Sequence, residues 1–176
     1  MRPALWPTAL ALSALIALTA RAADEPLWLG AFVNEKQSRE GIDAAIETAV
    51  SGMNFVTRPI ARRRLKKTNA PYRQVVISRT SDVVSVAFDG QSAVETPGDG
   101  RPIKWKRSDG EMFDVSAEVK DGALVQTFKA SDGQRVNTFT ANAAGQLTME
   151  ATITSPQLAK PVIYTLLYER ARPPSP

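Results

Sequence analysis

The sequence of 176 residues contains no cysteine and no histidine. Without cysteine there is no disulfide, so a hydrophobic core alone has to hold the fold together. The lack of histidine excludes the Ser-His-Asp triad, the Cys-His dyad and the usual zinc and copper sites. A glycine-rich phosphate loop and a serine nucleophile elbow are also missing. We therefore expect no metal site, no cofactor and no catalytic residues, while chemistry based on carboxylates, lysine or calcium stays open.

The first residues have the features of a secretory signal peptide. A positive charge at Arg2 precedes an apolar run from Ala4 to Ala20, and the small residues Ala20 and Ala22 suit a cleavage site. The alternative is an uncleaved membrane anchor, for which this run is at the short limit. We expect residues 1–22 to be removed and residues 23–176 to form a single domain that is periplasmic or secreted.

The charge of the remaining chain is small. Removal of residues 1–22 takes away Arg2 and Arg21 and lowers the formal net charge from +4 to +2. Such a balance selects no partner by itself, and an exported protein rarely meets nucleic acid. We expect a monomer without a nucleic-acid partner. For any basic patch we consider an anionic membrane as the possible partner.

One segment has the periodicity of a helix. Between residues 38 and 53, apolar residues recur at steps of three and four, which places them on one face: Ile42, Ala45, Ile46, Ala49, Val50 and Met53. Thr57 with Pro59 is a start signal for a second helix that runs to about Lys67. Together they predict a helix-turn-helix insert.

From Tyr72 onward apolar and polar residues alternate, and glycines recur every 10 to 12 residues. The series consists of Gly90, Gly100, Gly110, Gly122, Gly133 and Gly145. The first five of these six glycines follow an aspartate, and Asp-Gly between alternating runs predicts a tight hairpin turn. With an apolar segment at 27–33, the pattern predicts ten strands, the others near 73–80, 83–88, 91–96, 102–108, 111–120, 123–130, 134–141, 146–154 and 162–170. The fold class is mainly β: a ten-stranded up-and-down antiparallel barrel with the helical insert after the first strand. An open curved sheet packed on the helices is the alternative.

The alternation also predicts an apolar barrel lining. Ten strands enclose more volume than eight, and small inward residues such as Ala117 and Ala151 favour a ligand cavity over a packed core, which is the alternative. The residues expected to contact a ligand are Phe113, Val115, Met149, Tyr164, Leu166 and Tyr168.

This order of elements resembles the intracellular fatty-acid-binding proteins, part of the lipocalin-like (calycin) group. In that family a first strand leads to a helix-turn-helix lid and nine further strands, which close a barrel around a lipid. The local similarities are Trp28, the segment 55–60 and the ending 165–171. The resemblance implies a carrier of a lipid or fatty-acid-like molecule. The family's carboxylate clamp, an Arg-x-Tyr pair in the last strand, falls on Leu166 and Tyr168, so only the tyrosine is carried over.

The densest charge cluster lies in the second helix and comprises Arg58, Arg62, Arg63, Arg64, Lys66 and Lys67. Ile60, Ala61 and Leu65 form an apolar stripe that we expect to face the barrel mouth, with the cations outward. Near an anionic leaflet each cation contributes about 1 kcal/mol of attraction. An anionic membrane is therefore one hypothesis for this surface, and a solvated basic face is the alternative.

Asp109, Glu111 and Asp114 are close in sequence, but a glycosidase needs two carboxylates that face each other across a sugar. A turn position and an outward face favour structural roles for these acids. The sequence therefore predicts an exported, non-enzymatic carrier of a hydrophobic small molecule. The alternative is an envelope interaction or structural module with a filled barrel that binds a protein or an anionic membrane through its basic helix. An enzyme based on carboxylates or lysine is the third hypothesis.

Overall fold

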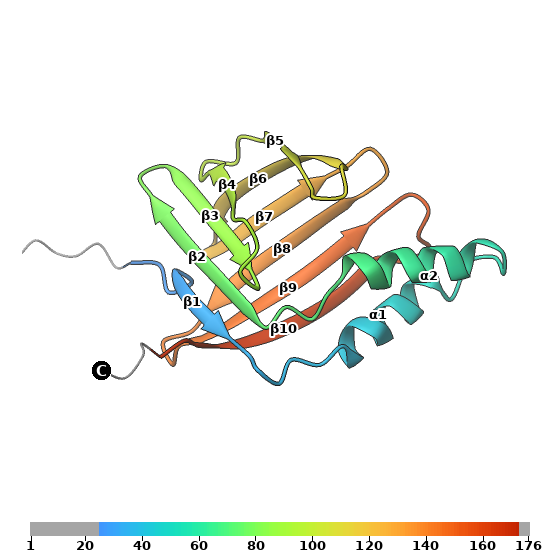
Figure 1. The fold of residues 1–176 in the computed structure, drawn as a ribbon, viewed down its shortest axis with the longest axis horizontal. Coiled ribbons are helices and arrows are strands. Elements are labelled where there is room, and N and C mark those ends of the chain that lie inside the picture. The colour runs from blue at the N-terminus through green and yellow to red at the C-terminus, as the bar shows by residue number, and fades with distance from the viewer. Residues whose placement is uncertain (1–24, 173–176) are drawn as a thin grey trace, which may run out of the picture.

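The computed structural model describes residues 25–172, so the expected signal peptide, residues 1–22, lies outside the described residues. Both helices follow the first strand, as predicted (Figure 1). The strands are β1 (Gly30–Val33), β2 (Gln74–Thr80), β3 (Val83–Phe88), β4 (Val94–Pro97), β5 (Ile103–Lys106), β6 (Met112–Lys120), β7 (Ala123–Lys129), β8 (Gln134–Ala141), β9 (Gln146–Thr154) and β10 (Val162–Arg170). The helices are α1 (Glu40–Val50) and α2 (Thr57–Thr68).

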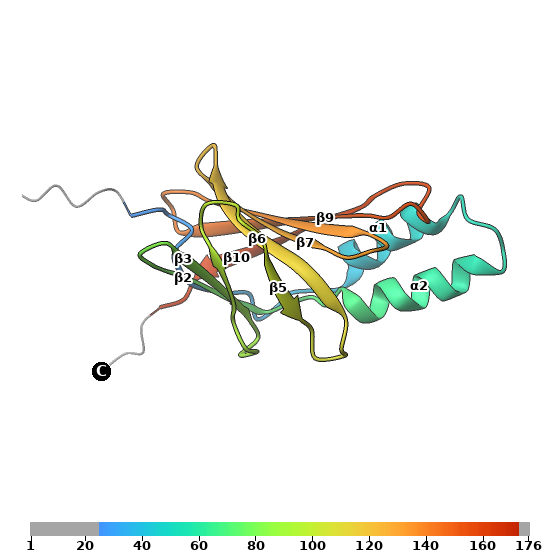
Figure 2. The same cartoon turned by 90° about the horizontal axis from the view of Figure 1, so that it is seen from above.

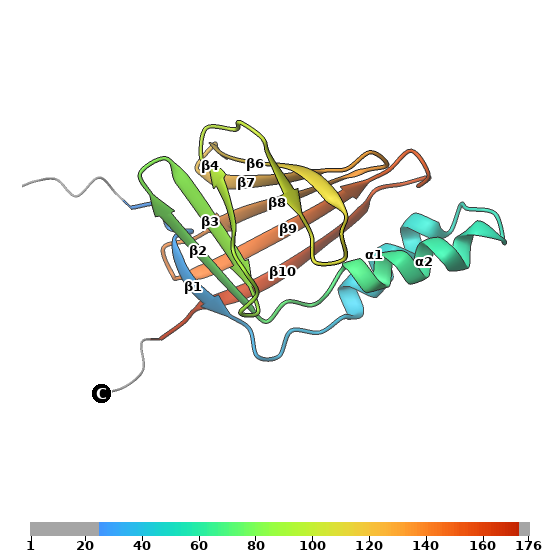
Figure 3. The same ribbon diagram turned by 45° about the horizontal axis from the view of Figure 1, so that its top comes forward.

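The strands form one antiparallel sheet that curls into a nearly closed barrel (Figure 3). Its order is β4, β3, β2, β1, β10, β9, β8, β7, β6, β5, so the first strand pairs with both β2 and the last strand. The seam lies between β4 and β5. Just after β4, the Gly100 amide donates to the Ala117 carbonyl of β6 at 2.9 Å, which narrows the seam. The predicted up-and-down barrel is confirmed, and the open sheet is not formed.

Two glycines show why the turns fall where the sequence places them. Lys120 pairs with Ala123 across a two-residue turn in which Asp121 and Gly122 have φ of 51° and 80°. Positive φ at both positions is the type I′ geometry that suits the twist of a hairpin. Gly133 has a different reason: a Cβ there would lie 2.7 Å from the carbonyl oxygen of Thr154.

The two helices differ in how they meet the barrel. The inward face of α1 is fully buried along β10, through Ile42, Ile46, Ala49 and Val50. No residue of α2 is fully buried, although Ala61 and Leu65 pack against the core. The helical hairpin projects beyond the strand ends (Figure 2). Neither helix within residues 25–172 is long and apolar enough to cross a bilayer.

Candidate ligand-binding site

Strand register determines which side chains face the inside of the barrel. Val115, Phe128, Arg135, Ile153 and Val162 are successive cross-strand partners and form one inward row from β6 to β10. The row lies near the end covered by the helices, which we call the mouth. All the predicted contact residues lie on this inward face, and their contact with a ligand stays a prediction: Phe113, Val115, Met149, Tyr164, Leu166 and Tyr168.

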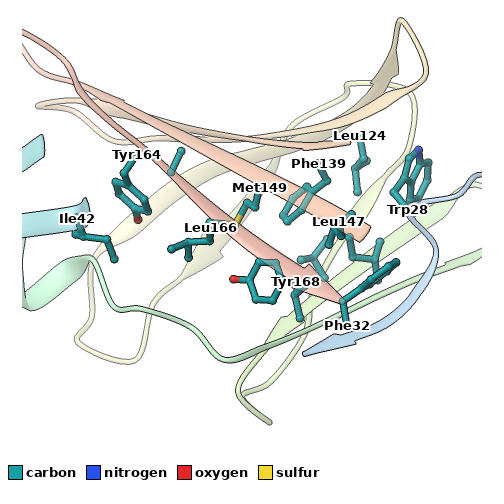
Figure 4. Close-up of a cluster of buried hydrophobic side chains, with 14 of the residues drawn as sticks. Trp28, Phe32, Ile42, Leu124, Phe139, Leu147, Met149, Tyr164, Leu166 and Tyr168 are labelled. Carbon is teal, nitrogen blue, oxygen red and sulfur yellow. The ribbon is translucent and has the colours of Figure 1, made fainter. Parts of the chain in front are cut away.

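The deeper part of the barrel is filled by the protein's own side chains. Phe139, Met149 and Leu166 are cross-strand neighbours, and each has at most 2% of its surface exposed (Figure 4). The small residues Ala117 and Ala151 belong to a second inward row, in which the longer Gln126 and Asn137 lie between them. Gln126 and Asn137 are buried and fill the space that the two alanines leave in the centre of the barrel. This packing differs from the expected hollow centre and directs attention to the mouth.

A half-buried cation, Arg135 of β8, lies at the mouth on the inward face. Its guanidinium donates from Nε to Asn137 Oδ1 at 2.8 Å and from Nη1 to Asn69 Oδ1 at 3.0 Å. A third bond runs from Nη2 to the Tyr164 hydroxyl at 3.0 Å. The Tyr164 hydroxyl in turn donates to Asn69 Oδ1 at 3.0 Å. Arg135 thus connects β8, β10 and the residue that follows α2.

All these acceptors are neutral. Among residues 25–172, no carboxylate lies within ion-pair distance of Arg135. A guanidinium has five N–H donors, and the three bonds above use one on each nitrogen. The acceptors on Nη1 and Nη2 lie 3.0 Å from each other, so they occupy the two parallel inner N–H groups, and the remaining N–H groups point apart. Each remaining N–H can bind one acid oxygen, whereas a bidentate acid would have to displace one or more of the present partners.

Two tyrosine hydroxyls face the same interior from β10 (Figure 4). Burial raises the pKa of both Tyr164 and Tyr168, while the nearby charge of Arg135 acts in the opposite direction. The Tyr168 hydroxyl and the Gln126 Nε2 have no hydrogen-bond partner among the described residues. Both tyrosines are therefore neutral, and the inside of the barrel keeps unused hydrogen-bonding capacity.

Aromatic side chains line the mouth next to Arg135. Trp105, Phe113 and Phe128 form a cluster with ring centroids 5.7 to 6.2 Å apart. On the other side of the barrel, Tyr72 stacks on Phe88 at 4.5 Å. All five side chains are partly exposed, unlike the fully buried residues below them. The mouth therefore offers an apolar aromatic surface beside one cation.

Comparison with known proteins identifies structures of similar fold but no relative in sequence. No model of a known protein family matches the sequence, and no curated protein matches it. A secretary abundant heat soluble (SAHS) protein from Ramazzottius varieornatus is similar in structure, with 10% identity, a TM-score of 0.58 and coverage of 84% of this chain and 97% of that chain. The chain has the fold of the fatty-acid-binding-protein barrels. A structure described as the REP1-NXSQ fatty acid transporter has 15% identity, a TM-score of 0.51 and coverage of 82% and 96%. At such identities the similarity concerns the fold alone.

Within this barrel the inward cation comes from a strand that the sequence reasoning missed. The clamp position in the last strand holds the uncharged Leu166, whereas Arg135 lies on β8. The sequence did contain a signal for this position. Across the turn at 142–145, the inward Leu147 of β9 pairs with Ala141 of β8. Because alternate residues of a strand share a face, Phe139, Asn137 and Arg135 then face inward as well.

The basic residues of α2 are largely used within the protein. Arg58 donates to the carbonyls of Ser51 and Met53, which follow the end of α1. Arg62 makes two 2.7 Å bonds to Glu47, which lower the pKa of that carboxyl. Lys66 lies 3.6 Å from Asp43 and 3.9 Å from Glu47, again on α1. These contacts hold the two helices together.

Arg64 instead connects α2 to the strand turns at the mouth. Its guanidinium lies 2.9 Å from Asp132 in the β7–β8 turn and 3.5 Å from Glu111 after the β5–β6 turn. Arg63 and Lys67 have no ion-pair partner among residues 25–172. The expected inward apolar stripe of α2 is only partly formed, because Ala61 and Leu65 touch the core whereas Ile60 keeps 68% of its surface exposed.

The clustered acids have structural partners. Arg107 donates to Asp109 at 2.7 Å and to Glu111, and its hydrogen bonds lower the pKa of Asp109 to about 2. Asp114 lies 2.7 Å from Lys104 on the neighbouring strand. No carboxylate among the described residues is fully buried, and no group of acids there is arranged to hold a metal ion.

Proposed function

We propose that this chain is an exported, non-enzymatic binding protein that carries a hydrophobic small molecule with an acidic head group. The observation that carries this proposal is Arg135, an inward, half-buried cation whose partners are all neutral. Keeping a charge out of water is costly unless it is paired, so a bound anion would offset part of that cost. The similarity in fold to a fatty acid transporter supports the same ligand class.

The aromatic mouth provides the apolar part of this site. The acidic head would bind Arg135, and the hydrocarbon part would lie against Trp105, Phe113 and Phe128. Because the deeper interior is filled, a longer chain would require displacement of side chains such as Met149. The protein would thus bind its ligand mainly between the mouth and the helical hairpin.

The test compares a fluorescent fatty acid with the alcohol of the same chain length. A charge-assisted hydrogen bond contributes about 1.5–3 kcal/mol, so the acid should bind roughly tenfold to 150-fold more tightly than the alcohol. Arg135→Met should remove this preference. Arg79→Met, at the exposed far end of β2, is the matched control and should keep it.

A second measurement tests whether a ligand is carried at all. Organic extraction of the purified protein followed by mass spectrometry should release an amphiphilic acid. Equal binding of acid and alcohol, or no binding together with no extracted ligand, would refute the proposal and favour the filled-barrel interaction module.

A further inference from the structure

The connection between the two helices and the first turn of α2 expose three large apolar side chains. Phe55, Val56 and Ile60 have 86%, 57% and 68% of their surfaces exposed, and we call these three residues the apolar tip. They lie at the start of α2, where the helical hairpin extends farthest from the strands (Figures 1 and 2). Contiguous exposed apolar residues of this kind typically mark a surface that binds a partner or a membrane.

The segment of chain that contains the apolar tip carries charges of one sign. Residues 51–67 contain six cations and no acid. Arg63 and Lys67 have no ion-pair partner among the described residues and remain fully available. On a helix with 3.6 residues per turn, Val56, Ile60, Arg63 and Lys67 share one face. This face of α2 is exposed at all four positions.

Along this face the apolar residues come first and the cations follow, which is the order of the acyl-chain and head-group layers met from inside a membrane outward. At 1.5 Å per residue, Arg63 lies about 10 Å behind Val56 along the helix axis. Interfacial apolar groups insert about 5–10 Å, to the boundary between head groups and acyl chains. A tip inserted to that depth would place Arg63 at the level of the head groups and Lys67 about 6 Å farther out, where their charges attract anionic lipids.

We propose that the apolar tip, with Arg63 and Lys67, docks the protein on a membrane surface that contains anionic lipids. The cations Arg62, Arg64 and Lys66 contribute less, because their partners on α1 and in the strand turns already neutralise them. This inference does not depend on a ligand inside the barrel, so failure of the ligand-binding proposal would leave it unaffected.

Co-flotation with phosphatidylcholine vesicles, with and without phosphatidylglycerol, tests the docking. The wild-type protein should bind the anionic vesicles much more tightly than the neutral ones. Phe55→Ser, Val56→Ser and Ile60→Ser combined should weaken binding at least tenfold. The matched control, Ile163→Ser with Leu167→Ser, removes exposed apolar side chains from the outer face of β10 and should bind like the wild type.

A second pair of variants isolates the charge. Each cation near an anionic surface changes partitioning about fivefold, so Arg63→Gln with Lys67→Gln should weaken binding roughly thirtyfold at low salt and less at high salt. Arg79→Gln with Lys120→Gln makes the same change in net charge at the far end of the barrel and should have little effect. Equal weakening by test and control variants would overturn the proposal. The proposal would also be overturned if the wild-type protein did not bind the vesicles but self-associated, and if the tip variant lost this self-association.

Discussion

The two helices contain a matched pair of isoleucines whose truncation should affect stability very differently. Ile46 of α1 is fully buried, whereas Ile60 of α2 is 68% exposed. Ile46→Ala loses the transfer free energy of the buried side chain and leaves a cavity, so we expect the free energy of unfolding to fall by about 2–5 kcal/mol. Ile60→Ala should change it by less than about 0.5 kcal/mol, because that side chain already contacts water.

Urea unfolding followed by tryptophan fluorescence measures both changes, with Trp28 and Trp105 as reporters within the barrel. The m-value should stay the same, because it scales with the surface exposed on unfolding. In a domain of about 150 residues, 1 kcal/mol shifts Tm by about 2–4 °C, so Ile46→Ala should melt at least about 4 °C below the wild type. Equal destabilisation by the two substitutions would refute the view that α1 closes the core while α2 is free for binding.

Three further pairs of measurements test other parts of the structure. Tyr164→Phe should cost about 1–2 kcal/mol in urea unfolding, because Asn69 and Arg135 lose a partner, whereas Tyr168→Phe removes an unpaired hydroxyl and should be neutral or stabilising. Burial raises the pKa of Tyr168, while unfolded tyrosine ionises near pH 10. The unfolded state therefore binds fewer protons above about pH 10, and stability should fall as the pH rises from there, less steeply in Tyr168→Phe. Gly122→Ala places a side chain at a φ of 80° and should cost about 1–2 kcal/mol, whereas Gly41→Ala in α1 has open space and should stabilise by about 0.5–1 kcal/mol. Thermal melts of the two glycine variants should shift in opposite directions.

The order of elements was predictable because it depends on local signals. Each Asp-Gly pair marks a turn, so one strand lies between each pair and the next. The type I′ geometry of Asp121 and Gly122 is the one that this dipeptide favours. The helical stripe from Ile42 to Val50 is likewise a property of its own segment. These signals gave all ten strands and both helices, with ends that differ from the structure by a few residues.

The inward position of the polar residues Arg135 and Asn137 was not predictable from alternation within one strand. In β8 the inward set mixes Arg135 and Asn137 with Phe139, while the outward set includes Val136, so neither face is clearly apolar. Only the pairing of β8 with β9 assigns Arg135 to the inside. The filled interior was missed for the same reason, because the space beside Ala151 depends on the length of its neighbour Asn137 in another strand.

Asn69 connects the two proposed sites. Its backbone and side-chain amides both donate to the carbonyl of Leu65 and so cap the end of α2, while its Oδ1 accepts from Arg135 and Tyr164. An acidic ligand bound to Arg135 would share the guanidinium with Asn69 and weaken that bond, since the positive charge is then partly neutralised. No residue of α2 is fully buried. The strands hold this helix through Asn69, the Arg64 ion pairs and the contacts of Ala61 and Leu65, in addition to the bonds that join it to α1. Ligand binding and docking of the apolar tip would therefore both act on α2, and by linkage each would change the affinity of the other by the same factor.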